Sequence, residues 1–162
     1  MKAKAFVVDT NVLVLANGRD TTEKQLRCQL ASIEALEEVR QHLAVIDNLG
    51  CILSEYQRYC NFSSQLGMGD EFFKYLFQHQ ADEHSCEQVV LTPLDKDCKS
   101  FKEFPNTEEL QKFDPSDKKF VAVALQSIHK PPILNATDSD WQAFSTALNK
   151  QGILVQEICE AL

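Results

Sequence analysis

The stretch Phe6-Val7-Val8-Asp9-Thr10-Asn11-Val12-Leu13 decides the fold that we predict for this chain. Its first three residues form an unbroken β-branched and aromatic run, which is typical of a strand covered on both faces in a parallel sheet. Asp9 ends that run, and ligands of open α/β sheets bind where the strands reach their carboxyl ends. We therefore predict a buried strand that carries an acidic side chain to a site. For Asp9 taken alone, a structural brace of the following turn is an equal alternative.

Hydrophobic periodicity and turn signals predict the elements that follow this strand. They are a helix from Thr22 to about Arg40, a strand at 42–46, helices at 49–60 and 71–80, a strand at 88–91, a short helix from Asn106, a longer helix from Pro115, a strand at 133–137, a helix at 141–150 and a strand at 153–155. Strands that alternate with helices in this way predict right-handed crossovers. The expected fold is α/β, a three-layer α/β/α sandwich with a mostly parallel five-stranded sheet.

Length and composition predict one domain over residues 1–162, because 162 residues with 44% hydrophobic content can build one well-packed core and are few for two. No apolar run is long enough for a transmembrane helix, and no signal-peptide pattern precedes the first strand. We therefore expect a cytoplasmic protein with no membrane partner. The six cysteines show no CxxC spacing, which excludes a zinc ribbon and a thioredoxin motif, and we expect them to be reduced and packed.

The net charge of −8 argues against a protein that coats nucleic acid through bulk positive charge. It does not exclude a nuclease, because catalytic carboxylates add negative charge themselves and a bound divalent cation reverses the local sign. Any affinity for nucleic acid must then come from local cations. The candidates nearest to the acidic motifs in sequence are Lys2, Lys4, Arg19, Lys118 and Lys119, and we predict Arg19, Lys118 and Lys119 as nucleic-acid contacts.

Four acids stand at positions that the predicted sheet can bring together: Asp9, Glu55, Asp117 and Asp138. Carboxylates that lie within a few ångströms of one another raise each other's pKa, so a protein that gathers them usually holds a cation between them. Because all the expected ligands are oxygens, the predicted ion is Mg²⁺ or Mn²⁺ and not zinc. We predict these four residues as metal ligands and as the catalytic set.

Each acid also has a structural alternative. Asp117 could be a favourable charge in the first turn of a helix, and Glu55 could be a solvated helix residue with Asp47 as a rival ligand. Asp114 and Asp140 are predicted to cap helices or support the ligands, in preference to binding the metal directly. Hydrogen bonds that orient the ligands are predicted from two polar residues beside the acids, Asn11 and Thr137. Bystander roles are predicted for the remaining acids and histidines near these motifs, namely Asp95, Asp97, His79, His84 and His129.

These acidic motifs resemble those of the PIN-domain family. Val8-Asp9-Thr10-Asn11-Val12 is similar to the family's opening motif, and Glu55 to the acid on an early helix. Asp117-Lys118-Lys119-Phe120-Val121-Ala122-Val123-Ala124 resembles its third motif, an aspartate before an apolar helix. Leu134-Asn135-Ala136-Thr137-Asp138-Ser139-Asp140-Trp141 resembles its last motif. The resemblance covers Ala5 to about Val155 in the family's order.

Membership of that family would imply a metal-dependent endoribonuclease acting on single-stranded or structured RNA, often the toxin of a toxin and antitoxin pair. An antitoxin protein would then be a partner. The chain departs from the compact toxin pattern through the extra length of residues 61–106. A PIN-like module that has lost catalysis and serves RNA binding or protein assembly is the alternative. A haloacid-dehalogenase-like phosphatase is disfavoured, because Asp9-Thr10-Asn11 lacks the second aspartate of that motif.

The predicted helix at 71–80 carries a dense aromatic set, with Phe72, Phe73, Tyr75 and Phe77 among ten residues. Such a set is more typical of a core or an interface between subunits than of a ligand site. It is larger than a three-turn helix needs on one side, so we predict that the protein forms a homodimer through helix surfaces.

Overall fold

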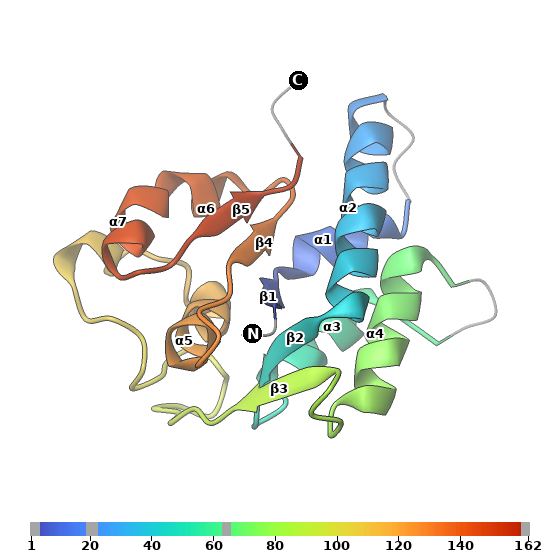
Figure 1. The fold of residues 1–162 in the computed structure, drawn as a ribbon. Helices are drawn as coiled ribbons and strands as arrows, with labels where there is room; N and C mark the ends of the chain where they lie inside the picture. Colours follow the sequence, from blue (N-terminus) through green and yellow to red (C-terminus); the bar gives the residue numbers. More distant parts are fainter. Residues whose placement is uncertain (1–3, 19–22, 63–65, 160–162) are drawn as a thin grey trace.

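The computed structural model describes residues 4–18, 23–62 and 66–159, and it places five strands in one all-parallel sheet (Figure 1). The strands are β1 (Ala5–Val8), β2 (Leu43–Asp47), β3 (Cys86–Val89), β4 (Ile133–Asn135) and β5 (Val155–Glu157). Their order across the sheet is β3-β2-β1-β4-β5. The α/β class and the five-stranded parallel sheet that the sequence predicts are therefore confirmed.

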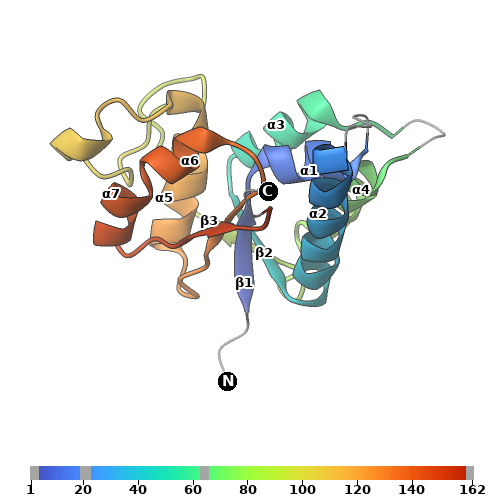
Figure 2. The ribbon, with the colours of Figure 1, turned by 90° about the horizontal axis from the view of Figure 1, so that it is seen from above.

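Seven α-helices of the described ranges cover the two faces of the sheet, and Figure 2 shows them from above. The first group is α1 (Thr10–Ala16), α2 (Glu23–Gln41), α3 (Cys51–Tyr59) and α4 (Met68–His79). The second group, on the other side of β1, is α5 (Lys118–Gln126), α6 (Ser139–Ala143) and α7 (Ser145–Lys150). This arrangement is the predicted three-layer sandwich. Within the ranges described, no helix combines the length and the apolar character needed to cross a bilayer.

The central strand β1 lies at the point where the strand order reverses. The chain moves from β1 to β2 and β3 on one side and then returns to β4 on the other side of β1. Backbone bonds hold β1 against β4, with Val7 N donating to Pro132 O at 3.0 Å and Asp9 N to Leu134 O at 3.1 Å. Ligands of open α/β sheets bind in the crevice that such a reversal leaves at the carboxyl ends of the strands. The sequence motif of Asp9 stands at that crevice.

Helix α1 is an element that the sequence patterns did not predict. The Asp9 carboxylate caps it by accepting a hydrogen bond from Asn11 N at 3.0 Å. Valines lower the helix propensity of the segment, but complete burial of Val12 and Leu13 stabilises it. Helix α4 approaches it so closely at Gly69 that a Cβ atom there would lie 2.0 Å from Leu13 O. Tertiary packing therefore outweighs propensity in this helix.

Two strand boundaries differ from the prediction. Strand β3 begins at Cys86 and not at residue 88, because Cys86 pairs with Ala44 of β2 and is buried, whereas the more apolar Val90 is 73% exposed. Strand β5 runs from Val155 to Glu157 along the edge of the sheet, beyond the predicted range of 153–155. In both cases the pairing with the neighbouring strand sets the limits, and hydrophobicity alone does not show it.

The prediction of six reduced cysteines is wrong, because four of them form disulfides. Cys28 of α2 pairs with Cys159, and Cys51 at the start of α3 pairs with Cys98. The pairs are separated by 131 and 47 residues, so no local spacing could reveal them. Cys60 and Cys86 are buried thiols. Disulfides of this kind are typical of oxidising environments and rare in the cytoplasm. They weigh against the cytoplasmic location, which stays a prediction.

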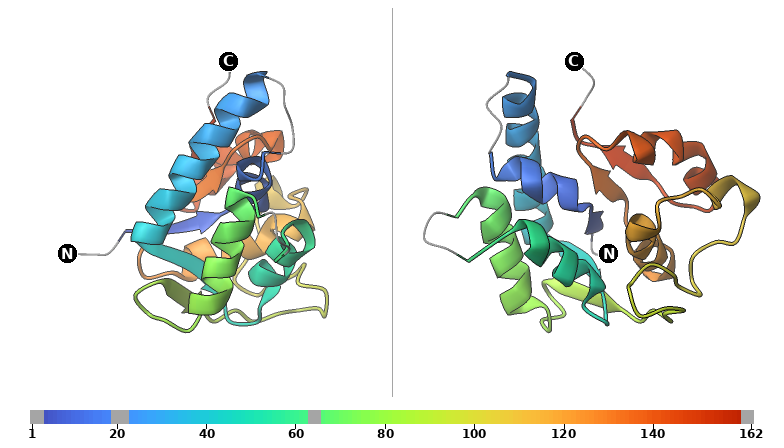
Figure 3. Two further views of the ribbon diagram at one scale, coloured as in Figure 1. Left: turned by 90° about the vertical axis from the view of Figure 1, so that its right-hand side faces the viewer. Right: turned by 180° about the vertical axis from the view of Figure 1, so that it is seen from behind.

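The aromatic set of α4 serves the core first. Phe72 and Phe73 are 1% exposed, and α4 packs beside α2 and α1, as the two further views of Figure 3 show. Phe77 is 49% exposed and forms an edge contact with Phe62, whose ring stacks on Phe73 at 5.2 Å between centroids. Phe77 of this set and the neighbouring Phe62 are thus the exposed aromatic pair at α4.

Candidate functional site

A cavity of about 370 Å³ opens at the carboxyl ends of β1 and β4, where the strand order reverses. All four predicted acids line it. Its walls consist of Asp9, Thr10, Asn11, Val14, Glu55, Tyr59, Asp114, Ser116, Asp117, Thr137 and Asp138. Residues from four separate parts of the chain therefore meet in this acidic cavity, as the parallel sheet predicts.

Asp9 is 5% exposed and accepts two hydrogen bonds. Its Oδ2 accepts from Asn11 N at 3.0 Å, and its Oδ1 accepts from the indole Nε1 of Trp141 at 3.1 Å. Burial raises the pKa of Asp9 to about 7, and the charges of Glu55 and Asp138 add to the rise, while the two hydrogen bonds oppose it. The indole bond ties the first motif to Trp141, the residue in α6 that ends the last motif.

Asp117 ends the 3-10 helix η2 (Pro115–Asp117) and directly precedes α5. Its pKa is raised to about 8, first by burial and then by the negative charges of Asp9, Asp114, Asp138 and Glu55. A carboxyl group in these surroundings is more stable protonated than charged near neutral pH. Burial is the largest cause of the raised pKa values of Asp9 and Asp117, and the negative charges of neighbouring carboxylates add to both.

Glu55 differs from the other acids because it has a cationic partner. Its Oε1 lies 2.7 Å from Lys119 Nζ, and its Oε2 accepts a hydrogen bond from Thr10 Oγ1. The Lys119 side chain is 4% exposed and also donates to Ser116 O. Lys119, which the sequence suggested as a surface contact for nucleic acid, is therefore inside the protein as the partner of Glu55. Buried pairs of this kind are costly to break from one side.

A pair of amides fixes the first acidic motif relative to the last. Asn11 Nδ2 donates to Asn135 Oδ1 at 2.8 Å, and Ala136 N donates to Asn11 Oδ1 at 3.0 Å. Asn135 Nδ2 in turn donates to the backbone oxygen of Asp138 at 2.9 Å. Asn135 is fully buried, and sequence reasoning did not select it as a positioning residue. An amide at the end of the apolar segment Ile133–Asn135 was the available signal.

The other polar residues of the last two motifs have local roles. Asp138 caps α6 by accepting from Asp140 N at 2.8 Å, and Asp140 itself is exposed and outside the cavity wall. Asp114 caps η2, accepting from Ser116 N at 3.0 Å and from Ser116 Oγ at 2.9 Å. Thr137 is exposed and lines the cavity. Asp114 and Thr137 thus line the cavity with the acids, whereas Asp140 does not.

The rival ligand Asp47 lies outside the acidic cavity. It ends β2, and its carboxylate accepts three backbone hydrogen bonds of 2.9 Å, from Leu49, Cys51 and Ile52. These bonds satisfy both oxygens with the turn and the first residues of α3. Asp47 is a structural brace, so Glu55 is the acid that α3 brings to the cavity.

The predicted surface cations do not form a patch at the cavity. Lys118 lies over the ring of Phe104, 4.9 Å from its centroid, outside the acidic cavity. Lys4 precedes β1 and is therefore at the opposite end of that strand from Asp9. Lys2 and Arg19 fall outside the described residues. Of the predicted cations that the structure describes, Lys119 alone adjoins the cavity, as the buried partner of Glu55.

The carboxylate oxygens of the acidic cavity suit a hard cation, but their side chains are not arranged around one position. Within the described part of the chain, no group of three or more Asp, Glu, His or Cys side chains is arranged so that it could hold a metal ion. Glu55 is held by Lys119, which removes one candidate from the set. The donor chemistry suits Mg²⁺ or Mn²⁺, and binding would require these side chains to move toward one another.

Comparisons of the chain with protein-family models, with curated proteins and with solved structures find no match. What the chain does must therefore be argued from the chemistry of its own residues. The resemblance of its motifs to the PIN-domain family stays a prediction.

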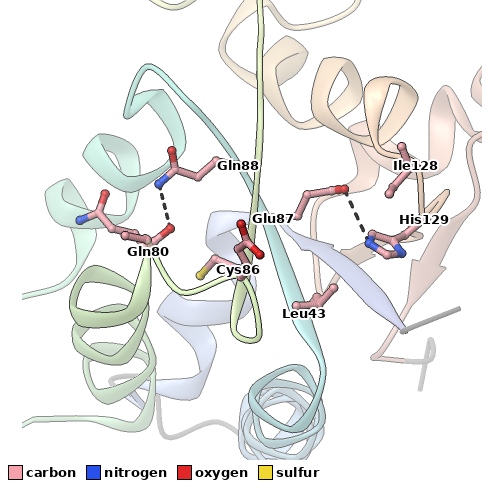
Figure 4. Close-up of a pocket in the computed structure, with 9 residues that line it drawn as sticks. Leu43, Gln80, Cys86, Glu87, Gln88, Ile128 and His129 are labelled. Carbon is pink, nitrogen blue, oxygen red and sulfur yellow. Dashed lines mark hydrogen bonds and ion pairs between the residues drawn. The ribbon is translucent and has the colours of Figure 1, made fainter.

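A larger cavity of about 560 Å³ lies at the opposite end of the sheet, beside the first residues of β2 and β3 (Figure 4). Its Glu87 carboxylate already has partners, since His129 Nε2 lies 3.7 Å from Glu87 Oε2 and Ser127 Oγ donates to the same carboxylate. Burial raises the pKa of the Cys86 thiol to about 11, with the charge of Asp82 adding to it, so the thiol stays protonated and unreactive. The acidic cavity is therefore the better candidate for chemistry.

Proposed function

We propose that this protein is a PIN-like, metal-dependent endoribonuclease that hydrolyses RNA phosphodiester bonds at the acidic cavity. The observation that carries the proposal is the meeting of Asp9, Glu55, Asp117 and Asp138 in one cavity at the reversal of the strand order. The raised pKa values of Asp9 and Asp117 support it, because clustered buried carboxylates destabilise a fold unless they bind something positive.

Asp9, Asp117 and Asp138 would hold Mg²⁺ or Mn²⁺, with Glu55 joining directly or through a water molecule. When bound, the cation lowers the pKa of a water molecule and stabilises the negative charge that develops on the phosphate. Trp141 and Asn11 would orient the Asp9 carboxylate through their hydrogen bonds. The paired amides of Asn11 and Asn135 would keep the first and last motifs in register.

An RNA-binding or assembly module without catalysis is the second candidate function. The ion pair of Glu55 with Lys119 favours it, because a cation of the protein already occupies the position next to one of the four acids. In this case the acidic cavity would be a remnant of a catalytic site, and its charge would only limit where RNA can lie.

Cleavage of a panel of single-stranded and hairpin RNAs tests the first function against the second. We expect cleavage in Mn²⁺ or Mg²⁺, complete inhibition by EDTA and loss of activity in Asp117→Asn. Glu38→Gln is the matched control, since Glu38 is exposed on α2 and lies outside the acidic cavity and its neighbouring cavities. If the folded, metal-supplemented protein leaves all RNAs intact, the binding-module function replaces the enzyme.

The predicted partners follow from this function. A toxin-like ribonuclease would require an antitoxin protein that blocks the acidic cavity, and co-purification of a partner that inhibits cleavage is the test. Self-association would use the exposed pair of Phe62 and Phe77, which gathers apolar surface on one side of α4. Light scattering that gives only the monomer mass over a wide concentration range, both for the wild type and for Phe77→Ser, contradicts the homodimer.

A further inference from the structure

A third cavity, of about 580 Å³, adjoins the acidic cavity and shares Glu55 and Ser116 with it. Three exposed cations line this basic cavity: Arg58 of α3 and Lys96 and Lys99 of the loop after β3. The two cavities are thus neighbours with opposite charge.

The three cations are available to a ligand. Within the described residues, neither Arg58 nor Lys96 nor Lys99 forms an ion pair. One exposed acid, Asp97, lines the same wall. In a chain with a net charge of −8, this is a local excess of positive charge directly beside the acids. Such an excess attracts anions to one place on an otherwise repulsive surface.

The loop that carries Lys96 and Lys99 is held in place at its base and at its tip. At its base, an antiparallel bridge joins Pro93 to Phe101, and Leu94 N donates to Ser100 O at 2.9 Å. At its tip, the disulfide of Cys98 with Cys51 attaches it to the first residue of α3. The same helix carries Arg58 and Glu55, so the disulfide sets the position of the lysines relative to both cavities.

We propose that the basic cavity binds the phosphate backbone of single-stranded nucleic acid and leads the strand into the acidic cavity, with the Cys51–Cys98 disulfide holding the lysines in place. The proposal deepens the proposed nuclease function, on which it rests. The cations are exposed and divided between a helix and a loop, which suits an extended polyanion better than one enclosed small anion. Lysine and arginine contacts to phosphates position a strand without reading its sequence.

Binding of a fluorescent oligouridylate, followed by anisotropy in EDTA, tests this inference without turnover. Lys96→Ala/Lys99→Ala should weaken binding several-fold and reduce the slope of log affinity against log salt by about 0.7 for each lysine. Lys74→Ala/Lys112→Ala is the charge-matched control, because both lysines are exposed and lie outside this cavity. Equal weakening by the two double variants would overturn the inference, because bulk charge would then explain the binding. The inference would also be overturned if inorganic phosphate displaced the fluorescent probe as strongly as unlabelled oligouridylate does at the same total concentration of charge.

Cys98→Ser tests the role of the disulfide, since it breaks this bond and leaves Cys28–Cys159 intact. Oligouridylate binding should weaken, and Lys96→Ala/Lys99→Ala should have a smaller effect in the Cys98→Ser background than in the wild type. Thermal melting establishes that each variant is folded, and the lysine variants of the wild type remain a test if Cys98→Ser is not. Unchanged binding in folded Cys98→Ser contradicts the role of the disulfide. A protein that binds through these lysines but cleaves no RNA in Mn²⁺ contradicts the nuclease and keeps the binding site.

Discussion

Asp9 and Asp47 make the most instructive comparison within this molecule. Each follows or ends a buried central strand, and the two carboxylates are 5% and 3% exposed. Asp47 accepts three backbone hydrogen bonds from the turn and helix that follow it. Asp9 accepts one backbone bond and one from Trp141, and the remaining space beside it is a cavity with four further acids. The end of β2 is therefore filled by backbone donors, whereas the end of β1 opens into a cavity.

The difference shows that an aspartate at a strand end is not yet a site. What separates the two is whether other elements bring charged groups and open space to the carboxylate. Around Asp47 the chain's own backbone supplies the donors, whereas around Asp9 the return of the chain to β4 brings Asp138 and α5 brings Asp117. Substitutions at the two positions should therefore differ in kind, with loss of function at Asp9 and loss of stability at Asp47.

The largest expected effect is on RNA cleavage. Asp9→Asn should lower the rate by more than the roughly 10–100-fold that loss of a supporting partner of a metal ligand costs. Asp47→Asn should leave the cleavage rate of the folded fraction within a few-fold of the wild type, because Asp47 does not face the cavity. Rate constants for both variants, measured on one RNA in Mn²⁺, make the test. If the two variants cleaved RNA at equal rates, the ends of β1 and β2 would not differ in function.

The next effect is the dependence of stability on pH without metal. Between its ordinary pKa near 3.8 and its folded pKa of about 7, Asp9 keeps its proton in the folded protein and loses it in the unfolded chain. The contribution of Asp9 to the free energy of unfolding should therefore fall as the pH rises through this window and stay level above it, while Asp117, with a folded pKa of about 8, continues the fall to about that pH. Asp9→Asn removes a share on the order of 4 kcal/mol, so its stability curve should be flatter. Urea unfolding in EDTA across the window measures both curves, and parallel curves would contradict the raised pKa.

Asp47→Asn is expected to lower the free energy of unfolding by less than the pH-dependent share of Asp9. The amide keeps one acceptor oxygen and turns an NH₂ group toward backbone donors that need an acceptor. Leaving a buried donor unsatisfied costs about 1–3 kcal/mol, and the variant should lose that amount at every pH. Urea unfolding gives the value. A stability equal to that of the wild type would mean that Asp47 is not the brace of α3.

The smallest effect that we predict is at the amide pair. Asn11→Ala removes the bonds to Asn135 and to Ala136 N, and it should lower the free energy of unfolding by about 1–2 kcal/mol. The exposed Asn149 provides the control in Asn149→Ala, which should change stability little. If the cleavage rate and the stability both fall in Asn11→Ala and neither falls in Asn149→Ala, the result supports a positioning role for Asn11. If both alanine variants behave alike, the amide pair does not couple the two motifs.

The sequence predicted the fold class and the gathering of the four acids because both follow from local pattern. An apolar run that ends in Asp9 identifies a central strand, and alternation of strands with helices implies that the strand ends lie at one edge. The partner of Glu55 could not be predicted, since Lys119 reaches it only through the packing of α5 against α3. The same holds for Asn135, and for the disulfide of Cys51 with Cys98, which joins residues 47 positions apart.

The measurement that tests the central claim most directly is thermal melting of the wild type and Asp9→Asn, each in EDTA and in millimolar Mn²⁺. In EDTA, Asp9→Asn should be at least as stable as the wild type, because one of the mutually repelling buried carboxylates is gone. Added Mn²⁺ should raise the melting temperature of the wild type and have little effect on the variant, because an ion that binds only the folded state stabilises it according to its affinity. If Asp9→Asn is clearly less stable in EDTA and both proteins respond equally to Mn²⁺, then Asp9 is a brace like Asp47 and the acidic cavity is not a metal site.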